Sequence, residues 1–155
     1  MDPSSPLPAV LTGRDRLRRA VNLVTLGTPL GLLLARTGGA RLERGPAGLL
    51  LAIGYRSPVP APRAPAVTVG DVVLLRMDAD ELARRPSLLV HEGRHAVQWA
   101  CWLGPLPFIP AYLLASVWSW IVCRDFALRN AFEVRAGLVA GGYVRPDAPP
   151  RDHRV

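Results

Sequence analysis

The sequence predicts an α+β fold, in which a small antiparallel sheet of two to three strands packs against a mainly helical core. Two short segments rich in apolar and β-branched residues, 48–55 and 66–76, are typical of strands. The second half of the chain has long apolar stretches interrupted by glycine and proline, which favours helices. A chain of 155 residues, half of them apolar, is long enough for one core and too short for two.

The chain is expected to hold one domain between two tails. Residues 1–12 are rich in proline and serine and predict a flexible tail, residues 13–143 form the domain, and residues 144–155 predict a second, polar and flexible tail. Within the domain, residues 14–35 begin with a basic turn and continue as an interrupted apolar run. Because that run is shorter than the about 20 apolar residues that span a bilayer, we expect a helix kinked at Pro29 that packs on the core.

The remaining elements follow from local signals. Residues 57–65 form a proline-rich connection between the strand segments, and residues 78–86 form a polar turn or a short helix. A helix is expected from Ser87 to about Leu103. The last helix is expected to begin near residue 126 or 129 and to end near residue 139, before a pair of glycines.

Residues 96–123 contain no acidic or basic side chain over 28 positions. Glycine and prolines at 104–110 predict a rigid loop, so the helix that follows, 111–123, would be about 20 Å long, short of the ~30 Å hydrocarbon core of a bilayer. Two buried helices joined by this loop therefore fit better than one membrane span. Trp118 and Trp120 keep attachment to a membrane surface open as an alternative.

The net charge of +7 arises from 19 basic residues, all of them arginine, against 12 acidic residues. Apart from the run at 14–19 the arginines are scattered, without a basic face interleaved with aromatic residues, so we expect no nucleic-acid partner. An anionic membrane surface suits this charge better. Cys101 and Cys123 are expected to be buried free thiols in a reducing compartment, which predicts a cytoplasmic protein, with peripheral or integral membrane attachment as the alternative.

The chain contains one H-E-x-x-H motif, formed by His91, Glu92 and His95. Residues four apart lie on one face of a helix, so both imidazoles can point at one ion. Zinc binds imidazole nitrogen and tolerates three protein ligands with an open position for water. Glu92 lies about 100° further round the helix, from where it can act as a general base on that water. The alternative is a helix with two surface histidines that bind nothing.

A catalytic zinc site needs a third protein ligand, and three side chains are candidates. His153 lies in the tail and is the poorest choice, while Asp125 closely follows an apolar segment. Glu133 fits best, because it lies on the last expected helix, far enough along the chain for an intervening helix to bring it back. A buried acid there needs a cation as partner. The alternative for Glu133 is an ion pair with Arg129 on the helix surface.

Two further polar side chains could belong to such a site. Gln98, one turn beyond the second histidine, could hydrogen-bond a ligand or serve helix packing. Tyr112 could stabilise a developing oxyanion, but its apolar neighbours favour a core aromatic.

The motif followed by Glu133 on a later helix resembles the gluzincin branch of the zincin metallopeptidases, and the preceding strands resemble the small sheet of those enzymes. The chain is more closely similar to short, uncharacterised bacterial zincin-like proteins. These carry a glutamine one turn after the second histidine, then Gly-Pro-Leu, then Asn-x-Phe-Glu-x-x-Ala, a match over roughly residues 66–143. Arg94 departs from the family pattern, in which the residues between the glutamate and the second histidine are usually uncharged.

This resemblance implies that His91, His95 and Glu133 bind Zn²⁺. It implies a zinc-dependent hydrolase of metallopeptidase type, in which Glu92 activates a zinc-bound water for attack on an amide carbonyl of a peptide or protein substrate. The alternatives are a zincin-like domain that binds metal without catalysis and a structural or interaction protein at a membrane surface.

Overall fold

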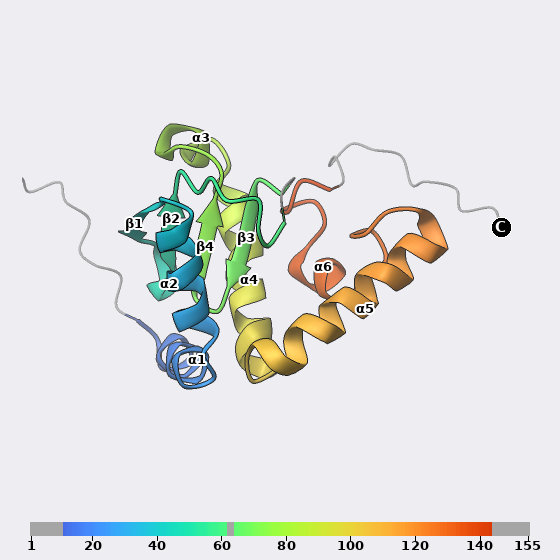
Figure 1. Cartoon of the computed structure of the whole chain (residues 1–155), viewed down its shortest axis with the longest axis horizontal. Helices are drawn as coiled ribbons and strands as arrows, with labels where there is room; N and C mark the ends of the chain where they lie inside the picture. Colours follow the sequence, from blue (N-terminus) through green and yellow to red (C-terminus); the bar gives the residue numbers. More distant parts are fainter. Residues whose placement is uncertain (1–10, 62–63, 144–155) are drawn as a thin grey trace, which may run out of the picture.

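Four strands form one mixed sheet in the computed structural model, which describes residues 11–61 and 64–143 (Figure 1). The strand order is β1-β2-β4-β3; β1 pairs with β2 and β3 with β4 in antiparallel fashion, whereas β2 and β4 are parallel. The strands are β1 (Arg41–Arg44), β2 (Leu50–Ile53), β3 (Ala66–Val69) and β4 (Val72–Leu75). The expected α+β class is confirmed. Of the tails expected at 1–12 and 144–155, residues 1–10 and 144–155 lie outside the described residues.

The expectation of two to three antiparallel strands was wrong in the number of strands and in one pairing. The extra strand, β1, carries three charged residues and is mostly exposed, so it lacks the apolar pattern of a strand. The 66–76 segment folds as a hairpin whose second strand, β4, lies between β2 and β3. This insertion makes the β2–β4 pairing parallel and buries every residue of β4. A strand buried on both faces has a continuous apolar sequence.

Helices cover both faces of the sheet (Figure 1). On one face, Val73 packs in a cluster with Leu88, and on the other Leu74 packs in a cluster with Ala35. Leu88 belongs to α4 and Ala35 to α2, so the sheet lies between these two helices. The helices of the described residues are α1 (Gly13–Val24), α2 (Gly27–Thr37), the 3-10 helix η1 (Pro46–Gly48), α3 (Ala79–Ala83), α4 (Pro86–Cys101), α5 (Pro105–Cys123) and α6 (Ala131–Ala136).

The N-terminal apolar segment bends at a different residue than expected. It divides into α1 and α2, bent by 73°, and the break lies at Thr25 and Leu26 rather than at Pro29. Pro29 is the third residue of α2, in the first turn, where backbone N–H groups have no partner within the helix and a proline costs little. Thr12 and Asp15 form a capping box that starts α1.

The loop expected at 104–110 is helical, so α5 is one helix from Pro105 to Cys123. Pro105 and Pro107 fall in its first turn, where no hydrogen-bond donor is required, and Pro110 alone removes a bond from the interior. The 19-residue helix is about 28 Å long. By length and composition α5 could cross a membrane, and so could α1 and α2 together as one bent span. Only 17% of the most apolar window of α5 is buried within the domain. The expectation of a short, buried helix was therefore wrong.

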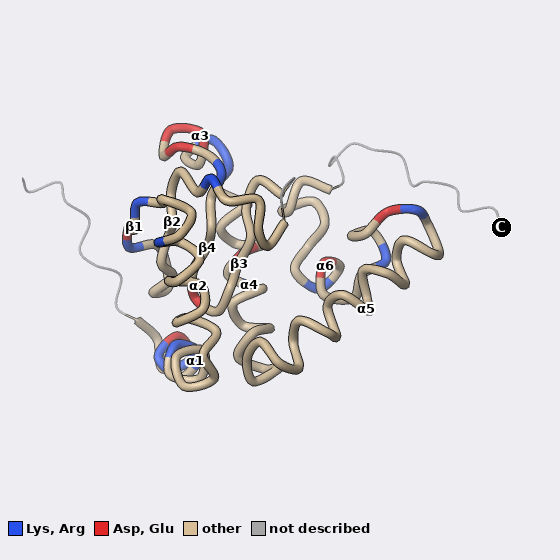
Figure 2. Tube along the Cα trace, viewed as in Figure 1, with Lys and Arg blue, Asp and Glu red and all other residues tan. Residues whose placement is uncertain are grey.

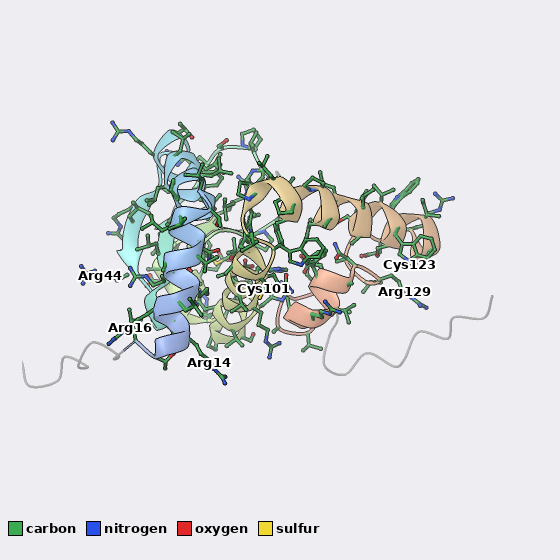
Figure 3. The ribbon with its side chains drawn as sticks, turned by 90° about the horizontal axis from the view of Figure 1, so that it is seen from below. Arg14, Arg16, Arg44, Cys101, Cys123 and Arg129 are labelled. Atoms are coloured by element: carbon green, nitrogen blue, oxygen red, sulfur yellow. The ribbon has the colours of Figure 1, made fainter. Side chains whose placement is uncertain are left out.

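Two further expectations were wrong. The last helix, α6, has six residues and is shorter than the expected segment, because the Asn130 side chain caps its first turn and Gly137, with φ of +98°, ends it. The two cysteines are free, as expected, but not buried: Cys101 is exposed and Cys123 is half-buried. Both lie near helix C-termini, where the apolar surroundings seen in the sequence are themselves exposed (Figure 3).

A buried ion pair holds the N-terminal helices on the sheet. The Arg18 Nε donates to Asp71 Oδ1 at 2.7 Å, and Arg18 also donates to the Ala47 carbonyl at 2.7 Å. Thr28 of α2 exchanges hydrogen bonds with the carboxylate and the amide of Asp71. Asp71 lies in the β3–β4 turn, next to Gly70, where a Cβ would lie 2.3 Å from backbone atoms of α2. The turn is therefore clamped between α1 and α2.

We expect Arg18→Ala to destabilise the fold by roughly 3–5 kcal/mol, because it leaves the Asp71 carboxylate buried without its charged partner. The matched control is Arg85→Ala, which removes an exposed ion pair with Glu81 and costs about 0.5 kcal/mol or less. Urea denaturation followed by circular dichroism measures both values. Equal, small losses for the two variants would contradict the role of the Arg18 clamp.

Candidate metal centre

Two helices bring the three expected ligands together. His91 and His95 lie one turn apart on α4, and their Nε2 atoms are 3.0 Å apart. Glu133 is the third residue of α6; its Oε2 lies 3.3 Å from His91 Nε2 and its Oε1 lies 3.4 Å from His95 Nε2. All three residues are buried. As expected, the chain brings Glu133 back to the helix that carries the motif, where its carboxylate contacts both histidines.

The position of Glu133 is set by the start of α6. The Asn130 side chain accepts from the Phe132 amide at 2.9 Å and donates to Ser116 Oγ of α5 at 2.9 Å. On α4, the Arg94 guanidinium donates to the Ala136 carbonyl at the other end of α6. Arg94 therefore turns away from the histidines and holds α6, which accounts for a charged residue at this position of the motif.

Hydrogen bonds to the other ring nitrogens orient both imidazoles. His91 Nδ1 lies 3.1 Å from the Gly137 carbonyl, which can only accept. His95 Nδ1 lies 2.8 Å from Gln98 Oε1, and the Gln98 amide nitrogen donates to the Phe132 carbonyl, which fixes the orientation of that amide. Both Nδ1 atoms must therefore carry the proton in the neutral rings. Each Nε2 is left with a lone pair directed at the other ring and at Glu133.

Three electron-rich groups thus meet in a buried space. Lone pairs of two Nε2 atoms and a carboxylate repel one another unless a cation lies among them. Glu133 Oε2 is buried and has no aligned hydrogen-bond donor, although His91 Nε2 is only 3.3 Å away. One proton can serve a single pair of these atoms, whereas a metal ion can serve all three. His91, His95 and Glu133 form a buried group that could hold a metal ion.

The charges of this cluster shift its titration. Burial disfavours the Glu133 carboxylate, but contacts with His91, His95 and Tyr112 outweigh burial and hold the pKa of Glu133 well below its usual value. Burial likewise disfavours the charged form of His95, but the adjacent Glu133 outweighs it and raises the pKa of His95. The cluster therefore favours an ionised acid beside positive charge.

Tyr112 joins the site from α5. Its hydroxyl donates to Glu133 Oε1, and its ring packs beside Phe108 and Phe132. Burial first, and the nearby Glu133 second, raise the pKa of Tyr112, so the hydroxyl keeps its proton. The expectation of a core aromatic was correct for the ring, but the contact with Glu133 was not expected. Gln98 accepts a hydrogen bond from the candidate ligand His95, which was one of the two roles expected for it.

Glu92 is buried beside the cluster and bonds to the sheet. The Thr68 hydroxyl on β3 donates to Glu92 Oε2 at 2.7 Å, and the Trp99 indole donates to the Thr68 carbonyl at 3.0 Å. Burial raises the pKa of Glu92 despite the attraction of His95 and the hydrogen bond from Thr68. Thr68 was missed in the sequence, because no local signal links it to a residue 24 positions later.

The cluster opens into one mainly apolar cavity of about 440 Å³. Its polar residues include Glu92, the three candidate ligands, Tyr112 and Tyr143. Its apolar lining comes from α2, β3 and α5 and includes Leu30, Leu34, Val67, Ile109 and Leu113. A concave apolar space with a few convergent polar groups is typical of a small-molecule or substrate site. Tyr143, whose ring lies 6.0 Å from that of His91, was not expected from the sequence.

The other candidate ligands do not join the cluster. Asp125 instead accepts hydrogen bonds from the amides of Ala127 and Leu128, in the turn after α5. His153 lies outside the described residues. The alternative ion pair of Glu133 with Arg129 is not formed among the described residues, and the Arg129 amide donates to Ser119.

Comparisons of this chain with models of protein families, with curated proteins and with solved structures gave no match. The resemblance to zincins therefore stays an expectation from the sequence motifs of this chain.

Proposed function

We propose that this protein is a zinc-dependent hydrolase, with His91, His95 and Glu133 as zinc ligands and Glu92 as the general base. The single observation that carries the proposal is the convergence of two Nε2 lone pairs and a buried carboxylate on one point. A structural helix pair has no need for such a cluster, because three mutually repelling acceptors destabilise a core that holds no cation.

The donor set and its dimensions favour zinc. Zinc bonds to imidazole nitrogen and carboxylate oxygen are about 2.0–2.2 Å long, so tetrahedral ligand atoms lie about 3.3–3.6 Å apart. The three separations in this cluster are 3.0, 3.3 and 3.4 Å. Magnesium and calcium prefer oxygen ligands alone, which two imidazoles do not provide. The hydrogen bonds from Nδ1 to Gly137 and Gln98 are the outer contacts that orient zinc-binding histidines.

Glu92 has the environment of a general base. It lines the same cavity as the candidate ligands, and burial raises the pKa of its carboxyl, so it binds a proton more strongly than an exposed glutamate does. Zinc supplies a Lewis acid that polarises a carbonyl and lowers the pKa of water. Glu92 takes the proton from water as the C–O bond forms, and it returns that proton to the leaving amine as the C–N bond breaks. The buried carboxylate thus serves both proton transfers.

A peptide or protein is the substrate class that this cavity suits. β3 is an edge strand of the sheet, and its residues line the cavity together with the cluster. An extended peptide can pair with backbone groups of an edge strand, and on β3 the Thr68 carbonyl is already taken by the Trp99 indole, so pairing would use the other edge groups. Such pairing would bring an amide carbonyl beside the cluster. The apolar lining would accept large apolar side chains of that peptide.

A metal-binding domain without catalysis is the second candidate. It is favoured by the low exposure of all three ligands, since a metal that fastens α4 to α6 needs no access. Glu92 distinguishes the two: a structural site has no use for an additional buried carboxylate in the cavity, and a hydrolase requires one.

Purified protein is expected to contain about one zinc per chain, and removal of the metal by a chelator is expected to lower its melting temperature. His91→Ala and Glu133→Ala should lose the metal, because each removes one of three ligands. The matched control is Asp125→Ala, which removes an acidic residue that was a candidate ligand but lies outside the cluster, and it should keep the metal. Metal analysis by mass spectrometry gives the content. The proposal is wrong if the purified wild-type protein contains no metal and its melting temperature does not change with chelator.

Gln98→Leu is expected to weaken zinc binding by roughly 10- to 100-fold, because the His95 ring loses the acceptor that orients it. Val97→Leu, at the adjacent exposed position on α4, should leave the affinity unchanged. Competition with a fluorescent zinc chelator measures both affinities. An unchanged affinity in Gln98→Leu would assign this glutamine to helix packing alone.

Glu92→Gln is expected to abolish hydrolysis and to retain zinc, because the amide keeps the shape of the carboxylate but cannot accept the proton. Cleavage of labelled casein and of a peptide library, followed by mass spectrometry, tests the activity. Zinc-loaded wild type without any cleavage, combined with metal-dependent stability, favours the non-catalytic candidate. Cleavage that persists in Glu92→Gln rules out the assigned base.

A further inference from the structure

The outward face of α5 is apolar over most of its circumference. Phe108, Tyr112, Ser116 and Ser119 form the stripe that packs on the domain. At about 100° per residue, the remaining exposed side chains cover an arc of about 220°. All of them are apolar: Leu106, Ile109, Leu113, Leu114, Val117, Trp118, Trp120, Ile121 and Val122, together with two prolines. Figure 2 shows no charged residue along the length of this helix.

Two exposed leucines extend this face at neighbouring turns. Leu26 joins α1 to α2 and is 62% exposed, and Leu103 joins α4 to α5 and is 66% exposed. The two turns touch, since a Cβ on Gly104 would lie 2.4 Å from the Thr25 carbonyl oxygen. Both leucines have positive φ, +67° and +56°, a conformation that costs energy for a bulky side chain. Glycine or asparagine would relieve that cost, so we infer that an exposed apolar side chain is needed at the tip of each turn.

Aromatic and basic residues stand at the C-terminal end of α5. Trp118 and Trp120 are exposed, and the Arg124 guanidinium lies 4.5 Å from the Trp120 ring centroid. Arg129 follows in the next turn and is exposed (Figure 3). Tryptophan and arginine at the border of an apolar surface are typical of the boundary between acyl chains and headgroups.

We propose that the protein docks on an anionic lipid bilayer through the outward face of α5 and the leucine tips at Leu26 and Leu103. The helix lies in the plane of the interface, because its inner stripe is packed on the domain and the turn after it carries exposed arginines that stay at the headgroups. The net charge of +7 complements anionic headgroups.

A bilayer fits this surface better than a second copy of the chain. One helix packed against another covers a stripe of roughly 100°, and the apolar arc here is about twice as wide. Lipid can cover the whole arc at once. Ile109 and Leu113 belong both to this face and to the cavity lining, so docking brings the cavity to the lipid surface. This docking does not depend on the metal site being catalytic.

The test is co-sedimentation of the full chain with vesicles of phosphatidylcholine and phosphatidylglycerol, with pure phosphatidylcholine vesicles for comparison. Wild type is expected to bind the mixed vesicles more tightly, and the double variant Leu114→Glu, Ile121→Glu is expected to bind roughly a hundredfold more weakly. Leu42→Glu, at an exposed leucine on β1, is the matched control and should bind as wild type. His91→Ala should also bind as wild type, which separates this proposal from the metal site.

A second measurement holds even if the double variant fails to fold. Lipids with brominated acyl chains are expected to quench the tryptophan fluorescence of wild type, and Trp118→Phe, Trp120→Phe should lose most of that quenching while still binding. Wild type that binds no vesicles, or binding that survives in a folded double variant, overturns the proposal. The proposal is also overturned if sedimentation equilibrium shows a dimer whose formation does not change with lipid and which dissociates in the double variant. The apolar face would then be covered by a second copy of the chain.

Discussion

The meeting of three acceptors inside the protein is the constraint on which the rest of the structure depends. The pitch of α4 places His91 and His95 on one face, and α6 must supply Glu133 within contact of both. Their Nε2 lone pairs converge because Gly137 and Gln98 hold the opposite ring nitrogens. Such an arrangement is costly in a dry core and becomes favourable around a cation, so local structure and metal chemistry are linked here.

The helix α5 serves this constraint on one side and faces outward on the other. Its inner stripe supplies Tyr112 to the Glu133 carboxylate and Ser116 to Asn130, the cap of α6. Without α5, the short α6 would have little to hold its first turn, since a six-residue helix is not stable alone. The outer side makes no polar contact with the domain, and all of its exposed side chains are apolar. One helix therefore combines support of the site with an exposed apolar surface, on which we propose that lipid docks.

The sheet connects the site to the rest of the fold through β3. Thr68 holds Glu92 toward the cavity, and the hairpin turn that follows β3 is fastened by Asp71 to Arg18 of α1. Because β3 is at the edge of the sheet, its far side borders the cavity instead of another strand. The ion pair and Glu92, the base that we propose, are thus held by neighbouring parts of one hairpin.

The sequence by itself determined the α+β class and the pairing of His91 with His95, because helical spacing and strand composition are local properties. It also indicated Glu133, through its place on the last expected helix and through the resemblance. Tertiary structure alone decided the parallel β2–β4 pairing, the contact of Thr68 with Glu92 and the unbroken helix through Pro110. These features depend on which segments meet in space and on whether a long helix continues past an interior proline. Contacts between residues far apart in the chain leave no periodic signal in it, and that is why packing, rather than pattern, decided them.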